Sequence, residues 1–425
     1  MSELKPLIVN ATDIQGGAAI ATYRLHQGLR RIGVDSSMLV QKKLTDDANV
    51  LGPQTRYQKM LGQLKPHLDQ LWVTQYNNRE AQLFSAAMIP DSIATKIQGI
   101  NPDIVHLFWV ADGQMRPETL RNLKKPIVWT LHDMWPFTGG CHYDGECGKY
   151  SHSCGACPVL HSSKESDLSR WIWRRKHNAW RNVDMTVVAT SQWLAQCARS
   201  SSLFGDYRIE VLPNGIDESK YKPIDKAFAR DVYGLPKDKR LILFSAGSLG
   251  DKRKGFQFLI PALQSLAKSD KESQVEAVII GASKPDRSME LGMNVHYIGR
   301  LQDEISQVLL YSAADVLVAP STQENLSNTV MESLACGTPV VAFNIGGMPD
   351  MIDHQKNGYL ASAFDTHDLA SGIMWVLESV NRRDMLSKNA RQTVLERYTL
   401  EKVANQYRAL YQSILDQPSK SPAGS

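Results

Sequence analysis

Residues 319–339 read APSTQENLSNTVMESLACGTP and mark the passage from a buried strand into a helix. The apolar run before this segment ends at Pro320, and a polar loop follows it. The helical pattern stops at Gly337, which has the character of the residue just past a helix end, and Pro339 follows shortly after. Strand, loop and helix in this order are the building unit of parallel sheets. The segment therefore predicts an α/β fold.

Short β-branched runs alternate with helical patterns on both sides of this segment, which predicts parallel sheets joined by crossover helices. In the second half of the chain we expect strands at residues 241–244, 278–280, 295–298, 316–318 and 340–343. In the first half we expect a helix at 18–31 and strands at 7–9, 104–108, 127–131 and 185–189.

The turn cluster VLPNG at residues 211–215 separates the two patterns and suits a hinge. A length of 425 residues fits two domains of about 200 residues each. We therefore predict two Rossmann-like, doubly wound α/β domains that face each other across a cleft, since such sheets bind ligands beyond the carboxyl ends of their strands. The expected parts are an N-terminal domain at 1–213 with a Cys-rich loop at 139–160, a second domain at 214–397, a C-terminal helix at 398–416 that packs back on the first domain, and a disordered tail at 417–425.

Composition narrows the classes of protein to consider. Apolar residues at 43% and charged residues at 22% exclude a disordered, collagenous or coiled-coil chain. We find no apolar run of about 18 residues and no signal-peptide pattern, so we expect a cytoplasmic protein. The 48 basic and 44 acidic residues leave a net charge of +4, too small to indicate nucleic-acid binding.

Two carboxylates flank the loop-to-helix passage of the opening segment. Glu324 is expected in the loop and Glu332 in the helix, eight positions later. Carboxylates accept hydrogen bonds from sugar hydroxyls, and backbone N–H groups at a helix start can meet phosphate oxygens. The alternative is a pair of surface glutamates beside an ordinary helix cap.

A basic turn and a glycine pair lie at two other strand-to-helix passages. Lys252-Arg253-Lys254-Gly255, next to Gly247 and Gly250, suits a diphosphate, because glycines allow close approach and the cations match its charge. A basic run is more often a solvated surface. Gly16-Gly17 forms a similar turn in the first domain and is weak evidence alone.

Other chemistry-bearing patterns are few. His132-Asp133 closes a predicted strand, where an α/β sheet offers its ligand site, although a histidine there is as often structural. We find no Ser-His-Asp elbow, Walker loop or zincin pattern, which argues against hydrolase, NTPase and metalloprotease functions.

With Glu324 and Glu332, Arg253-Lys254-Gly255, the segment 214–217 (NGID) and Gly16-Gly17 in this arrangement, the chain resembles glycosyltransferase family 4 over nearly its whole length. The resemblance implies a GT-B fold and a retaining enzyme that uses a nucleotide sugar. Residues 129–143, followed by three cysteines, resemble a subgroup common in bacterial exopolysaccharide and colanic-acid-type clusters. A glycan or lipid-linked glycan acceptor is therefore implied, with the first domain on the acceptor side and the second holding the donor.

The resemblance also assigns roles by position. Glu324 would contact the donor sugar, Glu332 the ribose, and Arg253 and Lys254 the diphosphate. The backbone of Gly16-Gly17 would lie near the phosphates, and His132 would face the transferred sugar. Further contacts to that sugar would come from the loop residues Asn325, Leu326 and Asn328. In two places the chain departs from the family pattern. The chain has Gly247-Ser248-Leu249 where the family usually has Gly-Arg-Leu, so Arg253 would supply the missing cation. It has Asp350 where the family has a glutamate, and we assign no role to this residue.

The expected chemistry follows from these parts. Departure of the nucleoside diphosphate builds negative charge that cations and backbone N–H groups can stabilise, while the anomeric carbon becomes oxocarbenium-like. We find no Asp-x-Asp sequence, so no catalytic metal is expected. The resemblance implies that the departing phosphate takes the proton of the acceptor.

Four cysteines occur at a spacing of C-x5-C-x6-C-x2-C: Cys141, Cys147, Cys154 and Cys157. This spacing predicts one structural Zn²⁺ with a purely architectural role, since four thiolates leave no open position. His142 and His152 are spare ligands. Two disulfides or four free thiols remain as alternatives, and the expected cytoplasmic location disfavours disulfides.

Residues 170–181 form a basic, Trp-rich stretch that suits an anionic membrane surface or a lipid-diphosphate acceptor. The alternative is a helix that packs its tryptophans inward. We therefore expect a cytoplasmic enzyme, with association at the inner face of the membrane as an option.

Two other functions compete with the transferase. One is another GT-B enzyme, such as a nucleotide-sugar epimerase or a phosphorylase, although a phosphorylase usually needs a longer chain. The second is a zinc-containing module that binds nucleic acid or a scaffold, supported only by the cysteines and the basic stretch.

Overall fold

The computed structural model describes residues 4–80, 82–245, 250–269, 274–281, 290–301 and 303–417. Gly247-Ser248-Leu249 and all but the first residue of the predicted tail 417–425 lie outside these ranges. The chain divides into two units, Met1–Gly215 with Leu400–Ser425, and Ile216–Thr399. These boundaries lie two residues beyond those expected from the sequence.

The first unit contains a parallel sheet of seven strands in the order β3-β2-β1-β4-β5-β6-β7. Its strands are β1 (Pro6–Thr12), β2 (Ser37–Lys42), β3 (Val50–Leu51), β4 (Ile104–Leu107), β5 (Ile127–Leu131), β6 (Met185–Ala189) and β7 (Arg208–Val211). Its helices are α1 (Gly17–Arg31), α2 (Arg56–Gln70), α3 (Ile93–Ile100), α4 (Leu168–Trp180), α5 (Gln192–Ser200) and α13 (Leu400–Leu415), with short 3₁₀ turns η1 (Pro117–Asn122), η2 (Trp135–Phe137) and η3 (Lys149–Ser151).

The second unit contains a parallel sheet of six strands in the order β10-β9-β8-β11-β12-β13. Its strands are β8 (Arg240–Ser245), β9 (Val275–Ile280), β10 (Val295–Gly299), β11 (Val316–Ala319), β12 (Val340–Phe343) and β13 (Gly358–Ala361). Its helices are α6 (Lys226–Tyr233), α7 (Phe256–Ser269), α8 (Glu304–Ala313), α9 (Asn328–Ala335), α10 (Met348–Met351), α11 (Thr366–Leu377) and α12 (Val380–Arg397), with the 3₁₀ turn η4 (Lys252–Lys254). Two Rossmann-like α/β units confirm the predicted fold class.

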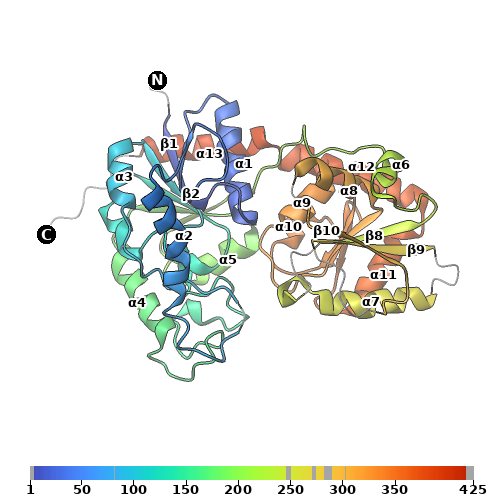
Figure 1. Ribbon diagram of the computed structural model, residues 1–425, viewed down its shortest axis with the longest axis horizontal. Coiled ribbons are helices and arrows are strands. Elements are labelled where there is room, and N and C mark those ends of the chain that lie inside the picture. Colours follow the sequence, from blue (N-terminus) through green and yellow to red (C-terminus); the bar gives the residue numbers. More distant parts are fainter. Residues whose placement is uncertain are drawn as a thin grey trace. The chain divides into compact units, whose positions relative to one another are not determined.

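The C-terminal helix α13 is part of the first unit, where it packs against α1 (Figure 1). Gly28 in α1 permits the close approach, because a Cβ atom there would lie 3.1 Å from the carbonyl oxygen of Leu400. Tyr411 is fully buried, and its hydroxyl lies 2.6 Å from Nδ1 of His106 in β4. The end of the chain thus helps to build the core of the unit that contains its beginning.

His26, also in α1, makes the first unit sensitive to acid. Its side chain has no exposed surface, and Nδ1 lies 2.9 Å from the hydroxyl of Ser36. Burial lowers the pKa of His26 to about 4, although Asp47 opposes this shift. The neutral ring is therefore favoured in the folded state, while the unfolded chain takes up a proton near pH 6.5.

We expect the free energy of unfolding to fall as the pH drops through the window from 6.5 to 4, with His26 contributing about 2 kcal/mol of loss between pH 7 and pH 5. Urea unfolding at both pH values measures this loss. A His26→Gln variant should show a shallower pH dependence, whereas His367→Gln, at an exposed position, should keep the wild-type dependence. Identical slopes in all three proteins would contradict the assignment.

Candidate functional site

The carboxyl edge of the second sheet brings a lysine and a glutamate together. Lys254 ends the turn η4, which follows β8, and Glu324 lies in the loop that follows β11. The Nζ atom of Lys254 lies 2.7 Å from Oε2 of Glu324. The side chain of Lys254 is 32% exposed and that of Glu324 is 12% exposed. Since β8 and β11 are neighbours in the sheet, their carboxyl ends meet at one edge. This edge is where parallel sheets bind ligands.

Two glycines hold the loops around this pair in close contact. A Cβ atom on Gly255, whose φ is +73°, would lie 1.6 Å from the carbonyl oxygen of Pro320. A Cβ atom on Gly346 would lie 2.0 Å from the carbonyl oxygen of Glu324, which accepts a hydrogen bond from the N–H of Gly347. The loops after β8, β11 and β12 therefore interlock through their backbones, and only glycine fits at the two crossing points.

Arg253 faces its own turn in this structure. Its guanidinium lies 3.2 Å from Asp251, and both side chains are about one-third exposed. Its carbonyl oxygen accepts a hydrogen bond from the N–H of Thr322, which ties the turn to the loop of Glu324. An exposed pair of this kind contributes little to stability.

Glu332 is buried in α9, with 6% of its surface exposed. Its Oε2 atom accepts a hydrogen bond of 3.0 Å from the hydroxyl of Tyr311. Burial and the neighbouring carboxylate raise the pKa of Tyr311 well above its usual value, so the hydroxyl stays protonated and remains a donor. The two predicted glutamates therefore differ, because Glu324 faces a cation and Glu332 a buried phenol.

The three predicted loop contacts also differ from one another. Asn325 and Leu326 are 3% and 7% exposed, and Leu326 belongs to the hydrophobic core of the unit. Its backbone, rather than its side chain, is thus left to face a ligand. Asn328, the first residue of α9, is partly exposed, and the side chain of Ser327 caps the helix by accepting from the N–H of Val330.

In the first unit, Gly16 and Gly17 lie where β1 passes into α1. Gly16 has a φ of +94° and occupies the N-cap position of α1. Because glycine has no side chain to cap the helix, the first backbone N–H groups of α1 receive no hydrogen bond from this position. This is the geometry that favours an anion at a helix start. Asp13, one turn earlier, is fully buried and accepts from the N–H groups of Leu44 and Thr45, which fixes the loop.

His132 follows β5 and stacks on Phe108 with ring centroids 5.6 Å apart. Its side chain is only partly covered, but its Nε2 atom is buried. Burial lowers the pKa of His132 to about 4 in spite of the neighbouring Asp133. The ring is therefore neutral near pH 7 and can donate or accept one hydrogen bond without carrying charge.

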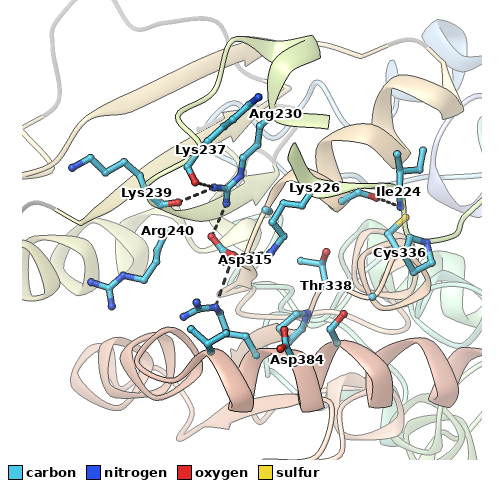
Figure 2. A pocket seen from close by; sticks show the side chains of 18 of the residues that line it. Ile224, Lys226, Arg230, Lys237, Lys239, Arg240, Asp315, Cys336, Thr338 and Asp384 are labelled. Atoms are coloured by element: carbon cyan, nitrogen blue, oxygen red, sulfur yellow. Dashed lines mark hydrogen bonds and ion pairs between the residues drawn. The ribbon is translucent and has the colours of Figure 1, made fainter. Parts of the chain in front are cut away.

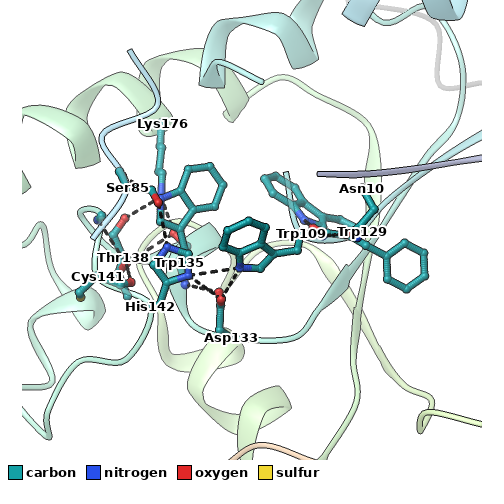
Figure 3. A network of polar contacts seen from close by, with 12 residues as sticks. Asn10, Ser85, Trp109, Trp129, Asp133, Trp135, Thr138, Cys141, His142 and Lys176 are labelled. Atoms are coloured by element: carbon teal, nitrogen blue, oxygen red, sulfur yellow. Dashed lines mark hydrogen bonds and ion pairs between the residues drawn. The ribbon is translucent and has the colours of Figure 1, made fainter. Parts of the chain in front are cut away.

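A buried polar network surrounds Asp133 (Figure 3). Nδ1 of His142 lies 2.6 Å from Oδ2 of Asp133, and Nε2 of His142 lies 3.0 Å from the hydroxyl of Ser85. Asp133 also accepts from Nε1 of Trp109 at 2.8 Å. This Ser-His-Asp arrangement leaves no pattern in the sequence, because Ser85 lies 57 positions away from His142 in the chain. Ser85 has no exposed surface, so its hydroxyl is not placed to act as a nucleophile. The network instead anchors the loop after β5.

The four cysteines of the predicted zinc site are all free thiols. Cys141 and Cys157 are buried in one small hydrophobic cluster, and Cys154 accepts a hydrogen bond from the N–H of Gly139. Within the described ranges, no three His, Cys, Asp or Glu side chains are grouped so that they could hold a metal ion. The predicted zinc site thus has no support in the structure. Elemental analysis of the purified protein is its direct test.

The basic, Trp-rich stretch 170–181 does not form one exposed face. It folds into α4 and the residues beside it, where Trp180 and Lys176 are buried. Lys176 donates to the carbonyl oxygens of Trp135 and Thr138. Arg175 forms a bidentate pair with Glu118 at 2.8 Å. The inward-packing alternative fits these contacts better than a lipid surface does.

Solved structures share this architecture along nearly the whole chain. A sucrose-phosphate synthase from Thermosynechococcus elongatus matches with a TM-score of 0.69 and 20% identity, covering 97% of this chain and 99% of that one. Anabaena Alr3699/HepE, solved in complex with UDP, matches with a TM-score of 0.63 and 18% identity, covering 96% and 100%. The fold is therefore that of the GT-B glycosyltransferases.

The sequence matches are consistent with this class. The family model described as Glycosyltransferase Family 4 matches residues 15–220, and the model described as Glycosyl transferases group 1 matches residues 225–393. The chain belongs to glycosyltransferase family 4, which confirms the resemblance drawn from the sequence.

Curated relatives match parts of the chain. N-acetyl-alpha-D-glucosaminyl L-malate synthase from Bacillus anthracis is 25% identical over 213 residues, which cover 49% of this chain and 54% of that protein. D-inositol 3-phosphate glycosyltransferase from Saccharomonospora viridis is 31% identical over 223 residues, covering 49% and 51%. The match thus spans about half the length of these two relatives.

Proposed function

We propose that the chain is a retaining glycosyltransferase that moves a sugar from a nucleotide-sugar donor to a glycan or lipid-linked glycan acceptor. The exopolysaccharide-type resemblance supports a role in building bacterial cell-surface polysaccharide. The observation that carries the proposal is the pairing of Lys254 with Glu324 at the carboxyl edge of the second sheet, among three interlocked loops. Family membership and the UDP and UDP-glucose complexes of Anabaena HepE add support for the donor class.

The proposed reaction uses the two side chains differently. The bond between the anomeric carbon and the β-phosphate oxygen breaks, and its electron pair leaves with the nucleoside diphosphate. Lys254, already oriented by Glu324, stabilises the growing charge on that phosphate. The acceptor oxygen bonds to the anomeric carbon on the face that the phosphate leaves, and its proton passes to the phosphate. Glu324 accepts from hydroxyls of the donor sugar and favours the positive charge that develops on the ring.

Acceptor-dependent release of nucleoside diphosphate tests this function. Purified protein is incubated with a candidate nucleotide sugar, with and without a lipid-linked glycan extract, and both the free nucleotide and the sugar configuration are followed. Release that needs an acceptor supports a transferase. Release without an acceptor, together with inversion at a sugar carbon other than the anomeric one, would instead identify the competing epimerase.

We expect Glu332→Ala to weaken donor binding about tenfold or more while leaving turnover at saturating donor nearly unchanged. A ribose contact is the same in the ground state and the transition state, so its loss raises KM rather than lowering kcat. The buried hydroxyl of Tyr311 would also lose its acceptor, so Tyr311→Phe is the matched control for local packing. Steady-state kinetics of both variants measure the split, and an unchanged KM in Glu332→Ala would contradict the ribose role.

Association with an anionic membrane surface forms part of the proposal. No helix in the described ranges is both long and apolar enough to cross a bilayer. Helix α2 offers a different kind of contact, because exposed apolar side chains recur on it every three or four residues, as on an interfacial helix. They are Tyr57, Met60, Leu64 and Leu68, with exposed fractions of 67%, 52%, 46% and 40%. Arg56 and Lys59 supply exposed positive charge on the same helix.

We expect the wild-type protein to float with vesicles that contain anionic lipid, and Met60→Glu/Leu64→Glu to lose this binding. Val232→Glu/Ile305→Glu replaces two exposed apolar residues of the second unit and should still float. Failure of the wild type to float would contradict the proposed membrane association and would leave the proposed transferase function unaffected.

A further inference from the structure

A cavity lies in the same unit as the Lys254–Glu324 pair, at the opposite edge of the sheet. Its volume is about 450 Å³, and Figure 2 shows side chains that line it. Arg240 is the first residue of β8, and Asp315 and Pro339 directly precede β11 and β12. Lys254 and Glu324 follow the carboxyl ends of β8 and β11. Since β11 has four residues, the two sites are separated by at least roughly 13 Å of strand.

The lining of this cavity is strongly basic. Three carboxylates face six basic side chains, which are Lys226, Arg230, Lys237, Lys239, Arg240 and Arg383. The excess of positive charge is local, because the whole chain has a net charge of only +4. Because basic side chains outnumber carboxylates in the lining, the cavity favours anions.

The carboxylate of Asp315 is already satisfied by the wall of the cavity. Its oxygens lie 2.7 Å from Nζ of Lys226 and 2.8 Å from Nη2 of Arg230, and accept from the N–H of Leu241 at 2.8 Å. Arg230, with 5% of its side chain exposed, also donates to four backbone carbonyl oxygens. Asp315 and Arg230 are therefore structural. Arg383 lies near the same carboxylate, with Nε 4.0 Å from Oδ1 of Asp315, and it also donates to the carbonyl oxygen of Leu377.

Three further cations of the lining, Lys237, Lys239 and Arg240, are partly or fully exposed. Lys237 pairs with Asp231, but both side chains are more than half exposed, so the pair contributes little. Lys239 directly precedes β8 and Arg240 is its first residue, and both are partly exposed (Figure 2). Helix α12 begins at Val380, which also lines the cavity, and the amino end of an 18-residue helix adds partial positive charge.

We propose that this cavity binds a small phosphorylated molecule, with the phosphate held by Lys239, Arg240 and Arg383. A volume of 450 Å³ exceeds what one inorganic phosphate fills and lies in the usual range for a small-molecule site. The guanidinium groups of Arg240 and Arg383 suit phosphate oxygens, because they present paired donors in a plane. The site does not depend on the proposed transferase function, because none of its residues belongs to the carboxyl edge of the sheet.

Calorimetric titration of the full chain with inorganic phosphate, pyrophosphate and glucose 6-phosphate tests the site. We expect glucose 6-phosphate to bind the wild type, and Lys239→Glu/Arg240→Glu to weaken this binding at least tenfold. The neutral variant Lys239→Gln/Arg240→Gln should weaken it by about threefold to tenfold, and thermal unfolding shows whether each variant is folded. Lys254→Ala, at the other edge, should bind glucose 6-phosphate as the wild type does.

Lys268→Glu/Lys388→Glu is the matched control, because it changes the net charge equally at two exposed positions outside the cavity. Wild-type affinity in this control, together with the loss in the cavity variant, supports the site. Equal loss in both charge-reversed variants would reduce the effect to long-range charge and overturn the proposal. Absence of wild-type binding to any of the three probes, or loss of that binding in Lys254→Ala, would overturn it as well.

Discussion

Lys254→Ala is expected to lower turnover about a hundredfold to a thousandfold, which corresponds to about 3–4 kcal/mol of transition-state stabilisation. The ammonium group lies 2.7 Å from Glu324 and is held there by a turn whose backbone is fixed to the neighbouring loop. A cation oriented in advance stabilises charge that develops on a leaving phosphate without reorganising during the reaction. Donor affinity should fall much less, because the proposed contacts of the diphosphate with backbone N–H groups would remain.

Lys252→Ala is the matched control, since Lys252 lies in the same turn with its side chain exposed. It removes the same charge two residues away and should retain most of the activity. Glu324→Ala should resemble Lys254→Ala, with turnover reduced more than donor binding. Equal loss in Lys252→Ala and Lys254→Ala would show that net charge, rather than the positioned ammonium, is responsible.

Gly255→Ala is expected to destabilise the second unit by about 3 kcal/mol or more and to abolish activity. The added Cβ atom would lie 1.6 Å from the carbonyl oxygen of Pro320, so the loop backbones must separate, and the φ of +73° adds strain. Because the loop of Pro320 leads to Glu324, the separation also breaks the pair with Lys254.

Gly234→Ala isolates the cost of the backbone angle in this comparison. Gly234 has a φ of +61°, but a Cβ atom there would meet no other atom within 4 Å. We therefore expect a loss of only about 1–2 kcal/mol in this control. Denaturant unfolding of both variants measures the difference. Similar losses would mean that the crossing of the loops at Gly255 is not tight.

The parallel α/β architecture was predictable because apolar strand runs and helical patterns alternate so clearly. All five strands expected in the second unit are present, and the predicted helix at 18–31 is α1. The strands that were not expected from the sequence are short or lie toward the edges of the sheets. Examples are β3, with two residues, and β13, with four, which contain too few apolar residues to give a recognisable strand pattern. Their pairing depends on neighbouring strands that sequence pattern alone does not specify.

The site was predictable only where its chemistry is local in sequence. The basic turn and the two glutamates stand out as residue types, so the sequence predicts Lys254 and Glu324 as candidates but does not predict their direct contact. Gly346 supports Glu324 from a different strand end, and Ser85 reaches His142 from 57 positions away. Neither contact leaves a pattern in the sequence. The cysteine spacing favoured a metal that the arrangement of the side chains does not support.

The most direct measurement is the thermal and chemical stabilisation of wild type and Glu332→Ala by a panel of UDP-, GDP-, ADP- and TDP-sugars. A true donor at about 100 times its dissociation constant adds about 2.7 kcal/mol to the free energy of unfolding. We predict that at least one nucleotide sugar stabilises the wild type to this extent. The same concentration should stabilise Glu332→Ala by at least about 1.3 kcal/mol less, as a tenfold loss of affinity requires. Lack of stabilisation by every nucleotide sugar, or equal stabilisation of both proteins, would contradict a donor site at this edge of the sheet.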